Sequence, residues 1–241
     1  MAGASAERQE QGFINKIKDA IKQNQNNPVT VKIGKTTLIG VNYAEKYPGR
    51  QVGGSEPYTD VVVKTVNGES YNLSMKGMSA PSLAGGGLKG LELAVPGLAK
   101  KFMMAAAAQL KTDKLNPGDK IPDIYGQISS ADKISIVVGN EAMGGPINYM
   151  YIGPMDVVGI YDKDKNILPL SGELTEAKAY AKSHDLYFRL RARREDQRYD
   201  PTAKDSSNIP KIYGKSPSKG DSAGRIVVTD KVPSNAKIVR V

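Results

Sequence analysis

The first part of the chain shows a helical pattern followed by a strand pattern. Apolar residues recur at helical spacing from Ala6 to Gln23, which predicts an amphipathic helix. Two short runs rich in β-branched residues follow, Val29–Ile33 and Thr36–Val41, with Gly34-Lys35 between them. They predict a hairpin of two strands, after which residues 42–57 form a loop rich in Gly, Pro and Tyr.

A second hairpin is predicted over residues 61–76. Asn67-Gly68 is a strong turn signal between two strand-like runs. A two-residue loop would set Asp60 opposite Met75 and mix polar with apolar side chains on each face. A three-residue loop, with Gly68 left-handed, sets Asp60 opposite Ser74 and keeps the faces separate. The apolar face of that register comprises Val61, Val63, Tyr71, Leu73 and Met75. We therefore predict the three-residue loop, with Asp60, Ser74 and Lys76 together on the other face.

The rest of the chain predicts a mixture of helices and strands. A glycine-rich loop at 77–90, which includes Lys89, offers backbone N–H groups that can hold phosphate. Helices are predicted at 98–112 and 175–183, and strands at 134–138, 149–152, 157–161, 186–194, 225–229 and 237–241. At 241 residues we expect one continuous domain, with a core at 1–112 and a β-rich extension at 113–241.

The composition limits the reactions and metal sites that the chain could support. The chain has no cysteine and a single histidine, His184, which excludes disulfides, thiolate metal sites and histidine-rich metal centres. Any hydrolysis would rest on carboxylates, lysine and a hard metal ion. The formal net charge of +9 suits a polyanionic partner such as nucleic acid. We expect neither a secretory signal nor a membrane span, because Pro96, Gly97 and two lysines interrupt the apolar stretch at 91–110.

The second hairpin resembles the PD-(D/E)xK nuclease superfamily. Asp60 at a strand start matches the first acid of the motif, and Lys76 on the next strand matches its lysine. Glu10 in the first helix matches the helix glutamate. The chain departs from the motif at Ser74, where the second carboxylate should stand. One restriction-endonuclease branch has Ser-x-Lys there and takes its carboxylate from the following helix, where this chain has Glu92.

The resemblance covers roughly residues 1–110 and implies a restriction-endonuclease-like α/β fold, a mixed sheet flanked by helices. It implies Mg²⁺ as cofactor, held by Asp60 with Glu92 or Glu56, because this ion prefers oxygen ligands. Lys76 would orient or activate the attacking water and would stabilise the charge that develops on the phosphate, and Ser74 would assist. The expected activity is cleavage of DNA, most simply double-stranded.

The strand pattern at 186–194 places a basic stripe on one face. Tyr187 falls in phase with three arginines, Arg189, Arg191 and Arg193, while the residues between them are apolar. Arginine rows contact phosphates and tyrosine stacks on bases, so the stripe predicts DNA binding. A solvated strand face is the plain alternative. Asp200–Gly224 predicts a long basic arm.

Two rival functions remain open at this point. The glycine-rich loop, the basic arm and the lack of cysteine also resemble many tailed-phage proteins, which indicates a virion or assembly protein without enzymatic activity. The third candidate is a DNA-binding accessory protein on a decayed nuclease core. A nuclease or an accessory protein would be found in the cytoplasm of a bacterial or phage-infected cell. An assembly protein would be found in the virion. A homo-oligomer is compatible with each of these functions.

Overall fold

The chain folds into two compact α/β units, each built from separate stretches of sequence. The computed structural model describes residues 2–50, 52, 56–78, 82–83, 87–192, 195–204, 208–214 and 225–241. Unit 1 comprises Met1–Pro81 and Val137–Ser183, and unit 2 comprises Ser82–Ile136 and His184–Val241. The chain therefore passes between the units three times, and the boundary expected near residue 112 is not where they divide.

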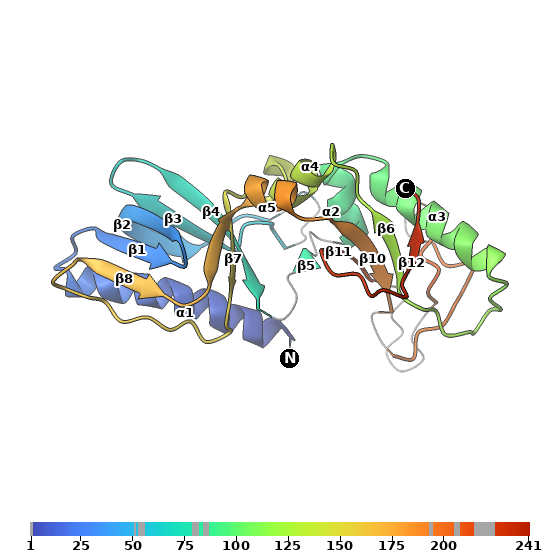
Figure 1. Cartoon of the computed structure of the whole chain (residues 1–241), viewed down its shortest axis with the longest axis horizontal. Coiled ribbons are helices and arrows are strands. Elements are labelled where there is room, and N and C mark those ends of the chain that lie inside the picture. Colours follow the sequence, from blue (N-terminus) through green and yellow to red (C-terminus); the bar gives the residue numbers. More distant parts are fainter. Residues whose placement is uncertain are drawn as a thin grey trace. The chain divides into compact units, whose positions relative to one another are not determined.

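Unit 1 is a mixed, curled sheet with a long helix packed against it (Figure 1). The strand order is β8-β1-β2-β3-β4-β7-β9, with β1 parallel to β8 and β4 parallel to β7. The strands are β1 (Val29–Ile33), β2 (Thr36–Lys46), β3 (Val61–Thr65), β4 (Ser70–Gly77), β7 (Tyr149–Gly153), β8 (Ile167–Leu170) and β9 (Glu173–Glu176). The Thr36 hydroxyl donates to the Leu174 carbonyl over 2.6 Å, which ties β2 to the edge strand β9 and curls the sheet.

Helix α1 (Ala2–Gln23) supplies one side of the core of unit 1. Phe13 and Ile17 of its apolar stripe are fully buried against the sheet, as the helical spacing predicted, and Ile21 is partly buried. The Phe13 ring meets Tyr151 of β7 edge to face, with centroids 5.3 Å apart. The short elements η1 (Glu141–Met143) and α5 (Ala177–Ser183) complete the unit.

Unit 2 is a five-stranded sheet with helices α2 (Gly87–Ala94) and α3 (Leu98–Thr112). The strand order is β12-β6-β10-β11-β5, and the strands are β5 (Ser82–Leu83), β6 (Ile124–Gln127), β10 (Tyr187–Arg191), β11 (Arg225–Thr229) and β12 (Lys237–Val239). Phe102 of α3 stacks on Phe188 of β10 with ring centroids 5.2 Å apart. This contact anchors the helix to the sheet.

Two strand predictions were wrong. Residues 134–138 lie in the helix α4 (Lys133–Val138), entered by a turn in which the Ser129 hydroxyl bonds the Asp132 carboxylate over 2.6 Å. A short apolar run is compatible with a buried helix as well as a strand, so its spacing could not decide. Residues 157–161 form a loop, in which Val158 and Ile160 are exposed.

Candidate functional site

The β3–β4 hairpin has the predicted register. Val61 pairs with Leu73 and Val63 with Tyr71, and the Asp60 amide donates to the Leu73 carbonyl over 2.8 Å. Gly68 closes the three-residue loop with a φ of 84°, in the left-handed region that favours glycine. The apolar face therefore points to the core, and Asp60 lies beside Ser74 at the end of the hairpin away from the turn.

Three groups converge on one oxygen of the Asp60 carboxylate. The Ser74 hydroxyl donates to Oδ2 over 3.1 Å, and the Met75 amide donates to the same oxygen over 2.6 Å. The Lys76 ammonium lies 3.8 Å from it. The side chains of Asp60 and Lys76 are 24% and 19% exposed, so both reach solvent from a partly buried position. The predicted grouping of Asp60, Ser74 and Lys76 is confirmed.

A second carboxylate, Glu10 of α1, stands close to this cluster. Its Oε2 lies 3.0 Å from the Lys46 ammonium at the end of β2, and its side chain is 13% exposed. Burial raises the pKa of Glu10 most, the bond to Lys46 opposes that shift, and the negative charge of Asp60 raises the pKa further. The charge of Asp60 therefore acts on Glu10, whereas the match of Glu10 to the helix glutamate of the motif stays a prediction.

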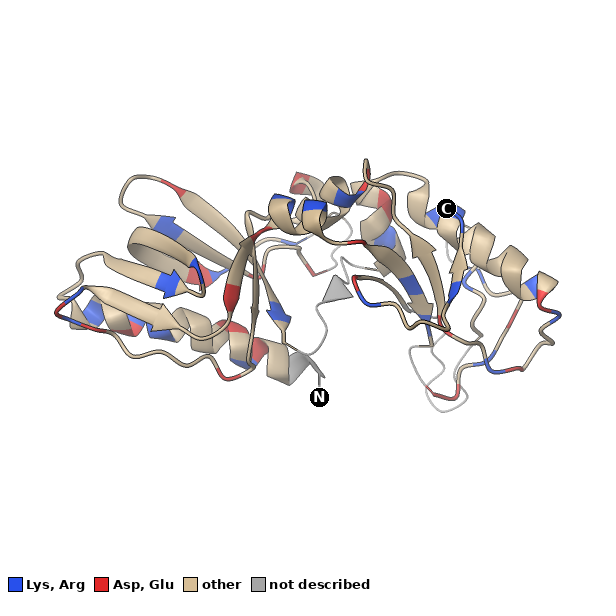
Figure 2. Cartoon of the chain, viewed as in Figure 1, with Lys and Arg blue, Asp and Glu red and all other residues tan. Residues whose placement is uncertain are grey.

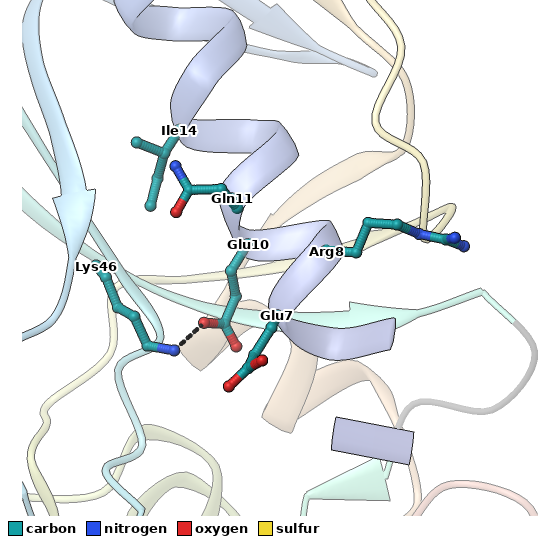
Figure 3. A pocket seen from close by; sticks show the side chains of 6 residues that line it. All are labelled: Glu7, Arg8, Glu10, Gln11, Ile14 and Lys46. Carbon is teal, nitrogen blue, oxygen red and sulfur yellow. Dashed lines mark ion pairs between the residues drawn. The ribbon is translucent and has the colours of Figure 1, made fainter. Parts of the chain in front are cut away.

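The Glu10–Lys46 pair lies in a surface pocket of about 430 Å³. Figure 3 shows the two charged groups turned toward each other across it. The pocket lining is Glu7, Arg8, Glu10, Gln11, Ile14 and Lys46. Backbone pairing between β2 and β3 continues past Lys46, since the Tyr47 amide donates to the Asp60 carbonyl over 3.0 Å. The pocket and the Asp60 cluster are thus joined through adjacent strand ends.

Gln9 holds α1 in the position that brings Glu10 close to the Asp60 cluster. Its amide nitrogen lies 3.2 Å from the Lys76 carbonyl, 2.9 Å from that of Gly153 and 3.1 Å from that of Pro154. Gln9 is buried, and it fixes α1 over the ends of the parallel strands β4 and β7. Sequence reasoning missed it, although a signal was present: Gln9 stands four residues before Phe13, inside the apolar stripe.

The other two acids named from the sequence are Glu92 and Glu56. Glu92 belongs to unit 2, where its two carboxylate oxygens accept the amides of Gly97 and Lys100, each over 2.7 Å. It caps the start of α3, a position where negative charge is stabilised by free N–H groups. Glu56 is exposed before β3. A metal-binding role for either residue stays a prediction.

The basic stripe has the predicted alternation. Phe188 and Leu190 of β10 are buried, while Tyr187, Arg189 and Arg191 are half-buried on the other face. Arg189 is already engaged within unit 2, where its Nε donates to the Asp123 carboxylate over 2.8 Å. Its guanidinium also lies 5.9 Å from the Tyr125 ring centre. Arg193 and much of the basic arm fall outside the described residues, and Lys89 is exposed on α2.

Among the described residues, no group of three or more acidic or histidine side chains is placed to hold a metal ion. No helix in the described part of the chain is long and apolar enough to cross a membrane. Comparison with protein-family models, curated proteins and solved structures gives no match to this chain. Functional inference therefore rests on the geometry of the site and on the motif resemblance.

Proposed function

We propose that the protein is a Mg²⁺-dependent DNA endonuclease whose reaction centre is the cluster of Asp60, Ser74, Lys76 and Glu10. The observation that carries the proposal is the convergence of Ser74 and Lys76 on the Asp60 carboxylate. The acid and the lysine stand on neighbouring strand ends, where the PD-(D/E)xK resemblance requires them. Their partial exposure leaves a path to a bulky substrate such as DNA.

Two carboxylates support the proposal of a magnesium ion at this site. Asp60 and Glu10 are two carboxylates close enough for the charge of one to raise the pKa of the other. Such a pair is stabilised by a cation, and Mg²⁺ commonly takes one or two carboxylates together with water and substrate phosphate. Asp60 and Glu10 would therefore hold the ion in place of the Asp60–Glu92 pair predicted from sequence. When bound, the ion would lower the pKa of a coordinated water and offset phosphate charge.

Each protein group has a distinct part in this proposal. The Ser74 hydroxyl and the Met75 amide both donate to one Asp60 oxygen, which fixes the orientation of the carboxylate. Lys76 presents a positive charge at the same edge, where it would stabilise the charge that develops on the phosphate. Lys46 offsets the charge of Glu10 through their ion pair, and Glu10 would be the second carboxylate available to a cation.

A plasmid-cleavage assay tests the proposal. The purified full-length chain should nick or linearise plasmid DNA with Mg²⁺ and should not do so with EDTA. Asp60→Asn should abolish cleavage, because the amide keeps the size of the carboxylate but removes its charge. Cleavage that persists in Asp60→Asn at the wild-type rate would place the activity elsewhere.

A DNA-binding protein without cleavage activity is the second candidate. The observation that favours it is the internal pairing of the acids, Glu10 with Lys46 and Asp60 with Lys76. With Ser74 in place of the second acid, the cluster carries two negative and two positive side chains. DNA binding without Mg²⁺-dependent cleavage in the same assay would decide for this candidate.

A further inference from the structure

The positive charge of the chain is concentrated in one of its two units. By sequence, unit 1 holds 14 Lys and Arg against 13 Asp and Glu, whereas unit 2 holds 20 against 12. Unit 1, which contains the Asp60 cluster, is therefore nearly neutral. Almost all of the formal charge of +9 belongs to unit 2, and a polyanion would be attracted to that unit first.

Within unit 2 the charge gathers on helix α3 and the neighbouring C-terminal strand β12, where blue segments are visible in Figure 2. Residues 98–114 and 237–241 contain six basic side chains and one acidic side chain, Asp113. We call this the α3–β12 surface, and its basic residues are Lys100, Lys101, Lys111, Lys114, Lys237 and Arg240. All six are exposed. Asp113 is matched by its ion pair with Lys237. Glu92, which caps the start of α3, adds one negative charge, so six basic and two acidic side chains leave an excess of four positive charges.

Packing holds the two elements together as one surface. A Cβ on Gly126 of β6 would lie 2.6 Å from both the Phe102 ring and a Val241 methyl group, so both side chains rest on this glycine. The Lys237–Asp113 ion pair joins β12 to the residue that follows α3. The buried stripe of α3, including Phe102, faces the sheet and leaves its lysines outward.

The spacing of the lysines suits a DNA duplex. Lys100 and Lys111 are eleven residues apart on α3, which is roughly 16 Å along the helix axis at 1.5 Å per residue. This length exceeds the width of the major groove, about 12 Å, so the two ends of the helix can reach phosphates on both sides of it. Between them, α3 presents Met104 and small alanines, which allow close approach.

We infer that the α3–β12 surface binds the phosphate backbone of double-stranded DNA, without reading its sequence. The inference takes DNA as the partner from the proposed function. It assigns DNA binding to a surface that the nuclease motif does not include. The basic stripe on β10 is the weaker candidate for DNA binding, because Arg189 is already paired with the Asp123 carboxylate. On α3, none of the ion pairs found among the described residues involves Lys100, Lys101 or Lys111.

The test measures DNA binding by the full-length chain at several salt concentrations, without Mg²⁺ so that no cleavage occurs. The variant is Lys100→Gln, Lys101→Gln and Lys111→Gln in one chain. The matched control is Lys22→Gln, Lys32→Gln and Lys35→Gln, which removes the same charge from exposed positions of unit 1. The α3 variant should make the negative slope of log affinity against log salt shallower by about 0.9 for each lost phosphate contact, and the control should keep the wild-type slope.

Three outcomes would overturn the inference: an unchanged slope in the α3 variant, an equal fall in both triple variants, or no DNA binding by the wild type. Anionic lipid vesicles serve as a second probe, and binding to them alone would assign the surface to a membrane instead. Cleavage is scored separately with Asp60→Asn. DNA binding that depends on the α3 lysines, with no cleavage by the wild type, would overturn the proposed function and leave this inference standing.

Discussion

At the scale of single residues, Lys76 offers the sharpest test of the reaction centre. Replacing it with alanine removes the ammonium 3.8 Å from Asp60, together with a side chain that is 19% exposed. We expect Mg²⁺-dependent cleavage to fall about a hundredfold or more while the folded state is kept. The measurement is the initial rate of plasmid cleavage, with circular dichroism to confirm folding.

Lys64→Ala is the control for that variant. Lys64 is an exposed lysine on the adjacent strand β3, and its ammonium lies over the Tyr43 ring, 5.0 Å from the centre. The same loss of charge at this position should leave the cleavage rate unchanged. Equal rate losses in both variants would indicate a general effect of charge on DNA binding rather than a role for Lys76 at the reaction centre.

Glu10 should make stability depend on pH. Its pKa is raised above the ordinary value of 4.5, so the folded chain holds this proton more tightly than the unfolded chain does. The part of the free energy of unfolding that Glu10 contributes therefore falls as pH rises from about 4.5 through the folded-state pKa. Glu10→Gln should lose this part of the pH dependence, which urea denaturation at acidic and neutral pH would measure.

Glu7→Gln is the matched control for Glu10, because Glu7 lines the same pocket from an exposed position. It should change the pH dependence of stability less than Glu10→Gln does, because the charge of Glu7 is the smallest of the effects that raise the pKa of Glu10. If Glu10→Gln and wild type show parallel pH profiles, Glu10 does not carry the burial cost that its position indicates.

Residue-level prediction from sequence succeeded where a local pattern fixed the geometry. Asp60, Ser74 and Lys76 could be placed together because the alternation of β4 and the glycine turn determine one register. The capping role of Glu92 could not be foreseen, because it depends on the turn between α2 and α3 bringing two amides to its carboxylate. The distance between Glu10 and Asp60 likewise depends on tertiary packing through Gln9.

At the scale of elements, the β3–β4 turn should be sensitive to its glycine. A Cβ on Gly68 would meet nothing within 4 Å, so the cost of Gly68→Ala is backbone strain alone at φ 84°. We expect a loss of about 1–2 kcal/mol in the free energy of unfolding. Asn67→Ala, at the neighbouring exposed position, should cost less, and chemical denaturation of both variants makes the comparison. A smaller loss for Gly68→Ala would show that the turn relaxes to another conformation.

Elements with strong local signals were predicted well, and short ones were not. Helix α3 was expected at 98–112 and is found there. Strand β8 was missed because its four residues include Pro169 and gain their partners from β1, far away in sequence. The apolar residues of α4 fit a buried strand equally well, and only the Ser129–Asp132 turn distinguishes the two.

At the scale of the whole molecule, DNA cleavage should be strongly sensitive to salt. The net charge of unit 2 implies that binding releases counterions, so affinity falls steeply between about 50 and 200 mM salt. At low DNA concentration the cleavage rate should fall in parallel, whereas at saturating DNA it should change little. Asp60→Asn should show the wild-type salt slope for binding. A cleavage rate that does not change with salt at low DNA concentration would contradict electrostatic binding of DNA.

The two-unit organisation was beyond the reach of sequence patterns. The strand and helix patterns and the motif resemblance predicted an α/β protein with a second, β-rich part, and both sheets are present. The assignment of α2 and α3 to the same unit as β10 and β11 depends on distant pairings, such as that of Leu83 in β5 with Val228 in β11. Periodicity carries no information about such partners.

The parallel pairing of β4 with β7 has a consequence for synthesis on the ribosome. Strand β4 ends at Gly77 and β7 begins at Tyr149, so β4 emerges long before its partner and meanwhile presents an open edge. Open edges recruit other strands, and pairings that close long loops form slowly. A nascent chain stalled between the two strands would expose the half-built sheet of unit 1, and that is the stage at which a chaperone would be needed most.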